Sequence, residues 1–153
     1  MKRALRCDKF TISALSELLR LYQNPEEAIK KIPTLRFLLR SKEEIKSLAE
    51  RVLPSVQNSL TNVAIVKIIN CNSQVGSGTL PNETIPSAGI SIENISKQKN
   101  RLFPIKLAKI LRELPTPIIC RIKAGAVILD LRCLEQEDLF IKQFNSLNCI
   151  KDL

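Results

Sequence analysis

Apolar residues in the first part of the chain recur with the period of a helix. The first such stretch places leucines and a tyrosine at i, i+3, i+4 and i+7: Leu15, Leu18, Leu19 and Tyr22. This spacing predicts an amphipathic helix, with Asp8 or Thr11 as its N-cap, that ends near the Asn24–Pro25 pair. Two short segments follow, a helix over residues 25–32 and a stretch over 33–39.

A capping box then predicts the start of a longer helix. In the sequence SKEE at residues 41–44, the Ser41 hydroxyl can accept from the Glu44 amide while the Glu44 carboxylate reaches back to the Ser41 amide. Behind it, apolar residues share one helical face: Ile45, Leu48, Ala49, Val52 and Val56. We expect Pro54 to kink or end this helix, because proline lacks the backbone N–H.

Residues 61–153 change to a mixture of strand and helix patterns. We predict strands at 62–69, 87–92, 118–122 and 127–131, the last two joined by a hairpin at Gly125, with helices from about 100 to 114 and over 137–147. The expected fold is α+β: a two-layer sandwich of a small antiparallel or mixed sheet with helices, preceded by a helical segment. We therefore divide the chain into a helical segment, 1–60, and an α+β domain, 61–153.

Composition narrows the chemistry that this chain can perform. It contains no histidine, which removes the commonest general base and zinc ligand, and we expect no metal site. Its five cysteines form no CxxC pair and are expected to be reduced thiols. Cys7 stands among basic residues, an environment that favours a thiolate, although a plain thiol is the commoner state of such a residue.

The net charge favours an anionic partner. With 24 Lys and Arg against 15 Asp and Glu, the formal charge is +9, yet there is one Tyr and no Trp, so few side chains could stack on exposed bases. Two interpretations of this charge remain open: surface charge without a binding role, and direct nucleic-acid binding. Neither a membrane span nor a secretion signal stands out in the sequence, so we expect a cytoplasmic protein.

Two segments are candidate binding sites. Arg3 and Arg6 are three residues apart, so in a helix both guanidinium groups would project from one face and form a receptor for a tetrahedral oxyanion; the alternative is a solvated basic helix start. Gly76, Ser77 and Gly78 lie in a glycine-rich stretch that lacks the Gly-Lys-Ser/Thr ending of a phosphate-binding loop. This stretch either approaches a ligand closely or forms a turn between strands.

Three segments together resemble one known family. With x for a position that is not part of the motif, they are KRALRxDKxT at residues 2–11, VGxGxLPxExxPS at 75–87, and LPTP at 114–117 followed by Arg121 and LDLR at 129–132; IPTLR at 32–36 also agrees. In order and spacing they resemble the C-terminal part of bacterial selenocysteine synthase, L-seryl-tRNA(Sec) selenium transferase, over essentially the whole chain. The family commonly has a Gly-Gly-Gly-Ser-like stretch where this chain has GSGT at 76–79.

The resemblance implies a fold and a reaction. The family has the aspartate-aminotransferase-like fold (fold type I), and this chain would include its C-terminal small domain. Family members use pyridoxal 5'-phosphate, held as a Schiff base by a lysine, to convert seryl-tRNA(Sec) into selenocysteinyl-tRNA(Sec) with selenophosphate, and they assemble as a ring of dimers. The resemblance assigns Arg3 and Arg6 to the binding of the selenium donor's anionic group.

The same resemblance places important parts outside this chain. The family's Schiff-base lysine lies upstream of the arginine motif, so we interpret the chain as an inactive C-terminal fragment with no catalytic residue and no bound cofactor of its own. Residues 1–60 would pack on the absent large domain, and their apolar faces are expected to drive self-association. Two alternatives stay open: an autonomous basic module that binds RNA or protein, and the small domain of a related pyridoxal enzyme with another substrate.

Overall fold

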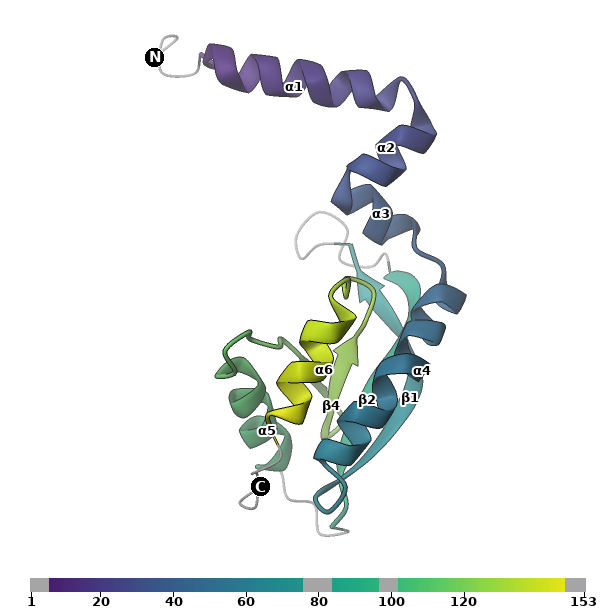
Figure 1. The fold of residues 1–153 in the computed structure, drawn as a ribbon, viewed down its shortest axis with the longest axis vertical. Coiled ribbons are helices and arrows are strands. Elements are labelled where there is room, and N and C mark those ends of the chain that lie inside the picture. Colours follow the sequence, from purple (N-terminus) through teal and green to yellow (C-terminus); the bar gives the residue numbers. More distant parts are fainter. Residues whose placement is uncertain (1–5, 76–83, 97–101, 148–153) are drawn as a thin grey trace. The chain divides into compact units, whose positions relative to one another are not determined.

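The computed structural model describes residues 6–75, 84–96 and 102–147 (Figure 1). The chain divides into two compact units, Met1–Leu39 and Arg40–Leu153. We describe each unit by itself.

The first unit consists of three successive helices: α1 (Lys9–Tyr22), α2 (Pro25–Lys31) and α3 (Pro33–Leu39). Asp8 is the N-cap of α1, which settles the choice between Asp8 and Thr11. Asn24 caps α2, and Pro25 occupies the first turn, where its missing N–H costs no hydrogen bond. No residue of α1 is buried, although its sequence is amphipathic.

The second unit begins with the long helix α4 (Lys42–Ser59). The capping box is present as predicted: the Glu44 amide donates to Ser41 Oγ at 3.2 Å, and the Ser41 amide donates to Glu44 Oε2 at 2.9 Å. The helix does not end at Pro54 but continues through it to Ser59. Val56 and Leu60, which follow the proline, are completely buried, and their burial outweighs the lost backbone hydrogen bond.

Four strands form one antiparallel sheet in the order β1-β2-β4-β3. They are β1 (Ala64–Gln74), β2 (Thr84–Asn94), β3 (Arg121–Lys123) and β4 (Ala126–Asp130). The β3–β4 hairpin turns at Ala124 and Gly125, both of which have positive φ (52° and 83°), so the predicted turn at Gly125 is confirmed. The prediction of a strand at 118–120 is wrong: this stretch follows LPTP and pairs with no strand.

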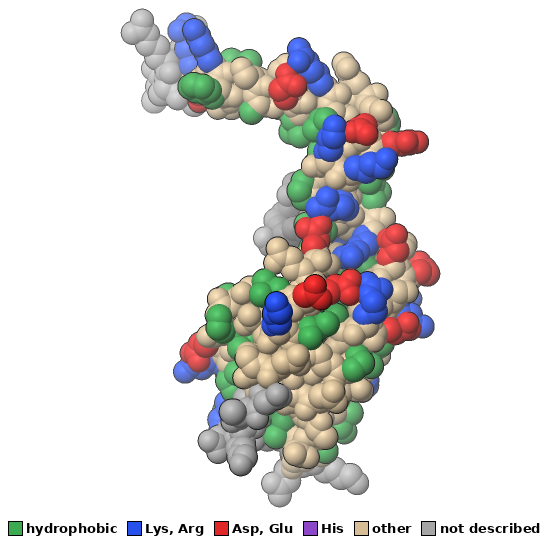
Figure 2. Space-filling view, in the orientation of Figure 1, with side chains coloured by type: hydrophobic (Ala, Val, Ile, Leu, Met, Phe, Trp, Pro, Cys, Tyr) green, Lys and Arg blue, Asp and Glu red, His purple; other side chains and the backbone are tan. Residues whose placement is uncertain are grey.

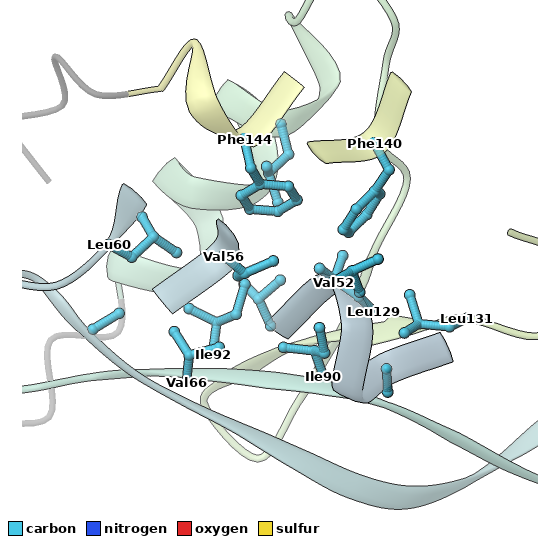
Figure 3. Close-up of a cluster of buried hydrophobic side chains, with 14 of the residues drawn as sticks. Val52, Val56, Leu60, Val66, Ile90, Ile92, Leu129, Leu131, Phe140 and Phe144 are labelled. Atoms are coloured by element: carbon cyan, nitrogen blue, oxygen red, sulfur yellow. The ribbon is translucent and has the colours of Figure 1, made fainter. Parts of the chain in front are cut away.

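Helices α4, α5 (Phe103–Arg112) and α6 (Glu137–Asn145) lie on one side of the sheet (Figure 1). The strands alternate so that one face is apolar, and cross-strand partners such as Val66 with Ile92 and Ile90 with Leu129 meet the helices there. Figure 3 shows Val52 and Val56 of α4 between these strand residues and the two phenylalanines of α6. The structure confirms the α+β class and the two layers, with a sheet that is wholly antiparallel.

Candidate functional site

Of the two arginines assigned to the selenium donor, Arg6 is described and Arg3 lies outside the described residues. Arg6 is exposed and lies two residues before the Asp8 cap, in non-helical chain. The expectation that a helix would align the two guanidinium groups therefore does not hold at Arg6.

Gly76, Ser77 and Gly78 also lie outside the described residues, but the strand ends on both sides of them are well defined. Ser73 near the end of β1 faces Ile85 near the start of β2 in the antiparallel register. At the same end, Asn72 Nδ2 donates to Thr84 Oγ1 at 3.2 Å. The end of β1 and the start of β2, which flank residues 76–83, are thus joined by a side-chain hydrogen bond as well as by the pairing of the strands.

A group of polar side chains at this end of the sheet forms what we call the Asp130 network. Its members come from five separate segments: Arg40, Ser73, Ser87, Arg121, Asp130 and Arg132. Asp130 Oδ2 accepts from Ser73 Oγ at 2.7 Å and from Arg121 Nη2 at 3.1 Å, and Asp130 Oδ1 accepts from Ser87 Oγ at 2.8 Å. One carboxylate therefore joins β1, β2 and β3 to β4.

Arg132 extends the network into the core. Its side chain is almost fully buried, with 4% of its surface exposed. Arg132 Nε donates to Ser73 Oγ at 3.2 Å, Nη1 donates to the Arg40 carbonyl at 2.9 Å, and Nη2 donates to the Pro86 carbonyl. Arg40 returns the contact, because its Nη1 donates to the carbonyls of Arg132 and Leu134. These charge-assisted bonds tie the start of the second unit to both strand ends that flank 76–83.

The sheet can bring Asp130 to this position because of Gly89. The two residues are direct partners in the β2–β4 register. A Cβ atom on Gly89 would overlap the carbonyl oxygen of Leu129, so any other residue would push β4 away from β2. The glycine permits the close approach that lets one carboxylate reach side chains of the neighbouring strands.

A hollow of about 560 Å³ adjoins the network. Asn72, Thr84, Arg121 and Lys123 are among its lining residues, and so is Cys71. The Arg121 side chain is positioned over it by Asp130 and by the Asn72 carbonyl, which accepts from Arg121 Nη1 at 3.0 Å. The lining of the hollow therefore mixes polar and apolar side chains and includes two cations, Arg121 and Lys123.

The cysteines do not add a nucleophile to this site. The four described cysteines are free thiols, as predicted. Burial is the main cause that raises the pKa of Cys71, Cys120 and Cys133, and the nearby Asp130 carboxylate raises the pKa of Cys71 and Cys133 further. These three thiols stay protonated at neutral pH. Across residues 6–75, 84–96 and 102–147, no group of three or more Cys, Asp and Glu residues is placed to hold a metal ion, and no helix is long and apolar enough to cross a membrane.

Four of the six residues of the Asp130 network stood out in the sequence, but no role could be inferred for them from the sequence. Ser87, Arg121, Asp130 and Arg132 belong to the segments that carry the family resemblance, whereas Arg40 and Ser73 were not singled out at all. Arg40 and Arg132 are 92 positions apart, so no local pattern connects them. An Asp and an Arg that alternate with leucines at the end of a buried strand, as in LDLR, are the one local sign of buried charge.

Comparison with known proteins gives one consistent result. The model of the family described as SelA, L-seryl-tRNA selenium transferase, matches residues 1–135. The L-seryl-tRNA(Sec) selenium transferase of Klebsiella pneumoniae is 46% identical over 142 residues, which is 93% of this chain and 30% of that protein. The proteins of the same name from Methylocella silvestris and Escherichia coli are 43% and 44% identical over 150 and 142 residues.

The matches define both the family and the share of it that this chain contains. The chain spans about 30% of the length of the curated relatives it matches. The match nevertheless covers almost all of the chain, including the Asp130 network and the arginine motif. The chain belongs to the L-seryl-tRNA selenium transferase family.

Proposed function

We propose that this chain is the C-terminal part of an enzyme that converts seryl-tRNA(Sec) into selenocysteinyl-tRNA(Sec) with selenophosphate. The observation that carries the proposal is the identity of 42–46% to several selenium transferases over 93% of the chain. In this proposal the enzyme works in the cytoplasm, where its tRNA is used, and assembles as a ring of dimers. This chain contributes binding and architecture and no catalytic residue.

Within this enzyme, Arg3 and Arg6 hold the anionic group of the selenium donor. A guanidinium group stays charged at every physiological pH and offers paired donors that match phosphate oxygens. Arg6 has the exposure that this role requires. The anion would be bound by arginine side chains and not by the N-terminus of α1, because Asp8 already occupies the first-turn amide of Thr11.

The proposed enzyme uses pyridoxal 5'-phosphate, but the residues described here do not fit a pyridoxal site. A Schiff-base lysine is enclosed by its pocket, whereas among residues 6–75, 84–96 and 102–147 no lysine is buried. We therefore assign no step of cofactor chemistry to this chain and place the cofactor in the remaining 70% of the enzyme.

The domain arrangement is part of the same proposal. The two-layer unit with its helices on one side of the sheet corresponds to the small domain of an aspartate-aminotransferase-like enzyme, and the helical segment that precedes it packs on the large domain. The exposed apolar residues of α1, among them Leu15 and Leu19, support such a contact. On the described part of each unit that is visible in Figure 2, basic and acidic side chains are interspersed.

A chimera tests the proposal. The matching segment of the Klebsiella pneumoniae relative is replaced by residues of this chain, and the hybrid is expressed in bacteria that lack their own selenium transferase. We expect radioactive selenium to be incorporated into protein. A folded hybrid that incorporates none would contradict the proposal.

Point variants of the hybrid test the donor site separately. Loss of charge-assisted hydrogen bonds predicts that Arg6→Ala and Arg3→Ala each reduce selenium transfer about tenfold to a hundredfold. Lys46→Ala, which removes an exposed cation from α4, is the matched control and should leave transfer unchanged. Full activity of both arginine variants would remove them from the donor site while leaving the family reaction intact.

A further inference from the structure

The start of α1 is fixed by one side chain. Asp8 Oδ1 accepts from the Thr11 amide at 2.9 Å, and Asp8 Oδ2 accepts from the Thr11 hydroxyl at 2.8 Å. These bonds lower the pKa of Asp8, so the carboxylate is ionised and keeps its cap at neutral pH. The backbone of Asp8 is extended (φ −71°, ψ 168°), so the chain turns away from the helix axis at this residue.

Without this cap, the sequence before α1 would favour a longer helix. Ala4, Leu5 and Arg6 are among the residues with the highest helix propensity, and neither glycine nor proline interrupts residues 2–12. Aspartate is a poor interior helix residue because its side chain competes for nearby backbone amides. The Asp8 cap is therefore what separates Arg6 from the helix, and local propensity opposes that separation.

We propose that Asp8 is a positioning residue for the selenium donor: by capping α1 it keeps Arg6 outside the helix, in the non-helical chain where the guanidinium group meets the anion. The inference rests on the donor role proposed above for Arg6. If the helix continued through Asp8, Arg6 would turn onto the surface of α1, and its direction relative to Arg3 would be set by the helical repeat.

The contacts of Asp8 distinguish this role from that of a counter-ion. Both carboxylate oxygens are engaged by Thr11, on the helix side of Asp8. A carboxylate that acted by pairing with Arg6 would weaken anion binding, and its removal would improve the site. If Asp8 instead acts as a cap that positions Arg6, its removal should weaken anion binding, because Arg6 would no longer be held in place.

Two substitutions separate the cap from the charge. Asp8→Ala removes both, whereas Asp8→Asn removes the charge and keeps an N-cap of similar strength. In the active chimera we expect Asp8→Ala to raise KM for selenophosphate about threefold to tenfold, the range that loss of one cap predicts. KM for seryl-tRNA should stay unchanged, and Asp8→Asn should restore the original KM for selenophosphate. Asn24→Ala removes the cap of α2 in the same unit and is the matched control.

Backbone chemical shifts provide a readout that does not depend on activity. In the chain carrying Asp8→Ala, the carbon shifts of Arg6 and Cys7 should become helical, whereas in Asp8→Asn they should match the original chain. Unchanged shifts in Asp8→Ala, an unchanged KM, or equal impairment by Asp8→Asn would each overturn the inference. An Arg6→Ala variant with normal KM for selenophosphate would instead refute the donor role on which the inference rests.

Discussion

The two units of this chain contain similar amphipathic helices with opposite outcomes. In the second unit, α4 buries five apolar residues against the sheet. In the first unit, α1 has an apolar stripe of comparable length, yet Leu15 and Leu19 remain 53% and 57% exposed. An apolar stripe thus indicates which face of a helix will be buried, but burial needs a second layer, and the described part of the first unit contains no such layer for α1.

The largest expected difference between the units is the effect of truncating an apolar side chain. Phe144 of α6 is fully buried, and its ring lies 4.9 Å from that of Phe140. Phe144→Ala should lower the free energy of unfolding by about 4 kcal/mol, through lost transfer energy and the cavity left behind. Leu19→Ala in α1 should change it by less than about 0.5 kcal/mol. Urea denaturation of both variants measures the contrast; equal effects would mean that α1 is buried after all.

Removal of an ionic side chain should show the same contrast between the two units, with a smaller change in the free energy of unfolding. Asp130 accepts hydrogen bonds from four groups. In the Asp130→Ala variant, the Ser73 hydroxyl and the Arg132 amide, which both belong to buried residues, would lose this acceptor. We expect a loss of about 3 kcal/mol in the free energy of unfolding, since buried polar groups become unsatisfied. Glu17→Ala removes the exposed ion pair with Arg20 in the first unit and should have little effect. Similar midpoints in denaturant for both variants would contradict a structural role for the network.

Self-association tests whether the exposed stripe of α1 behaves as an unsatisfied surface. Replacing both Leu15 and Leu19 by Glu should weaken association of the chain about tenfold, equivalent to about 1.4 kcal/mol. Ile119→Glu is the control, because Ile119 is 73% exposed in the second unit and lies outside the stripe. Sedimentation velocity over a range of concentrations gives the dissociation constants. A chain that is monomeric throughout would show that the stripe does not drive association.

Removal of a helix cap should show the same contrast between the two units, with a still smaller change in the free energy of unfolding. Ser41→Ala removes half of the capping box of α4, and we expect it to lower the free energy of unfolding by about 1 kcal/mol because α4 carries much of the core. Asn24→Ala removes the corresponding contact from α2, yet global unfolding of the second unit should not change. A shift in the denaturation midpoint for Asn24→Ala as large as that for Ser41→Ala would mean that the units unfold together.

The same contrast explains how much of the fold the sequence predicted. A run of β-branched residues identified the first half of β1, and the capping box and the spacing of apolar residues identified α4. The second half of β1 and the start of β2 were missed because many of their residues are polar: Asn72 faces Pro86 and Gln74 faces Thr84 across the ladder. There the strands are specified by hydrogen bonds between partners distant in sequence, which no hydrophobic pattern records.

The candidate site was predictable to a smaller extent. The family resemblance selected Ser87, Arg121, Asp130 and Arg132 as characteristic residues, but their mutual contacts depend on the close approach of strands at Gly89. Nothing in the sequence distinguishes Arg40 from the many other lysines and arginines. Its reciprocal contact with Arg132 exists because the start of α4 and the end of β4 meet in space.

The smallest expected effect is a pH dependence that again separates the units. In the second unit, Arg51 donates two hydrogen bonds to Glu137, and these lower the pKa of Glu137 below its ordinary 4.5. A carboxyl whose pKa is lower when folded adds stability above pH 4.5 and loses it as the pH falls through the folded pKa. Glu137→Gln should therefore reduce stability at pH 7 and converge with the original chain below pH 4.5. Lys31 likewise lowers the pKa of Glu27 in the first unit, but Glu27→Gln should leave the unfolding curve of the second unit unchanged at every pH.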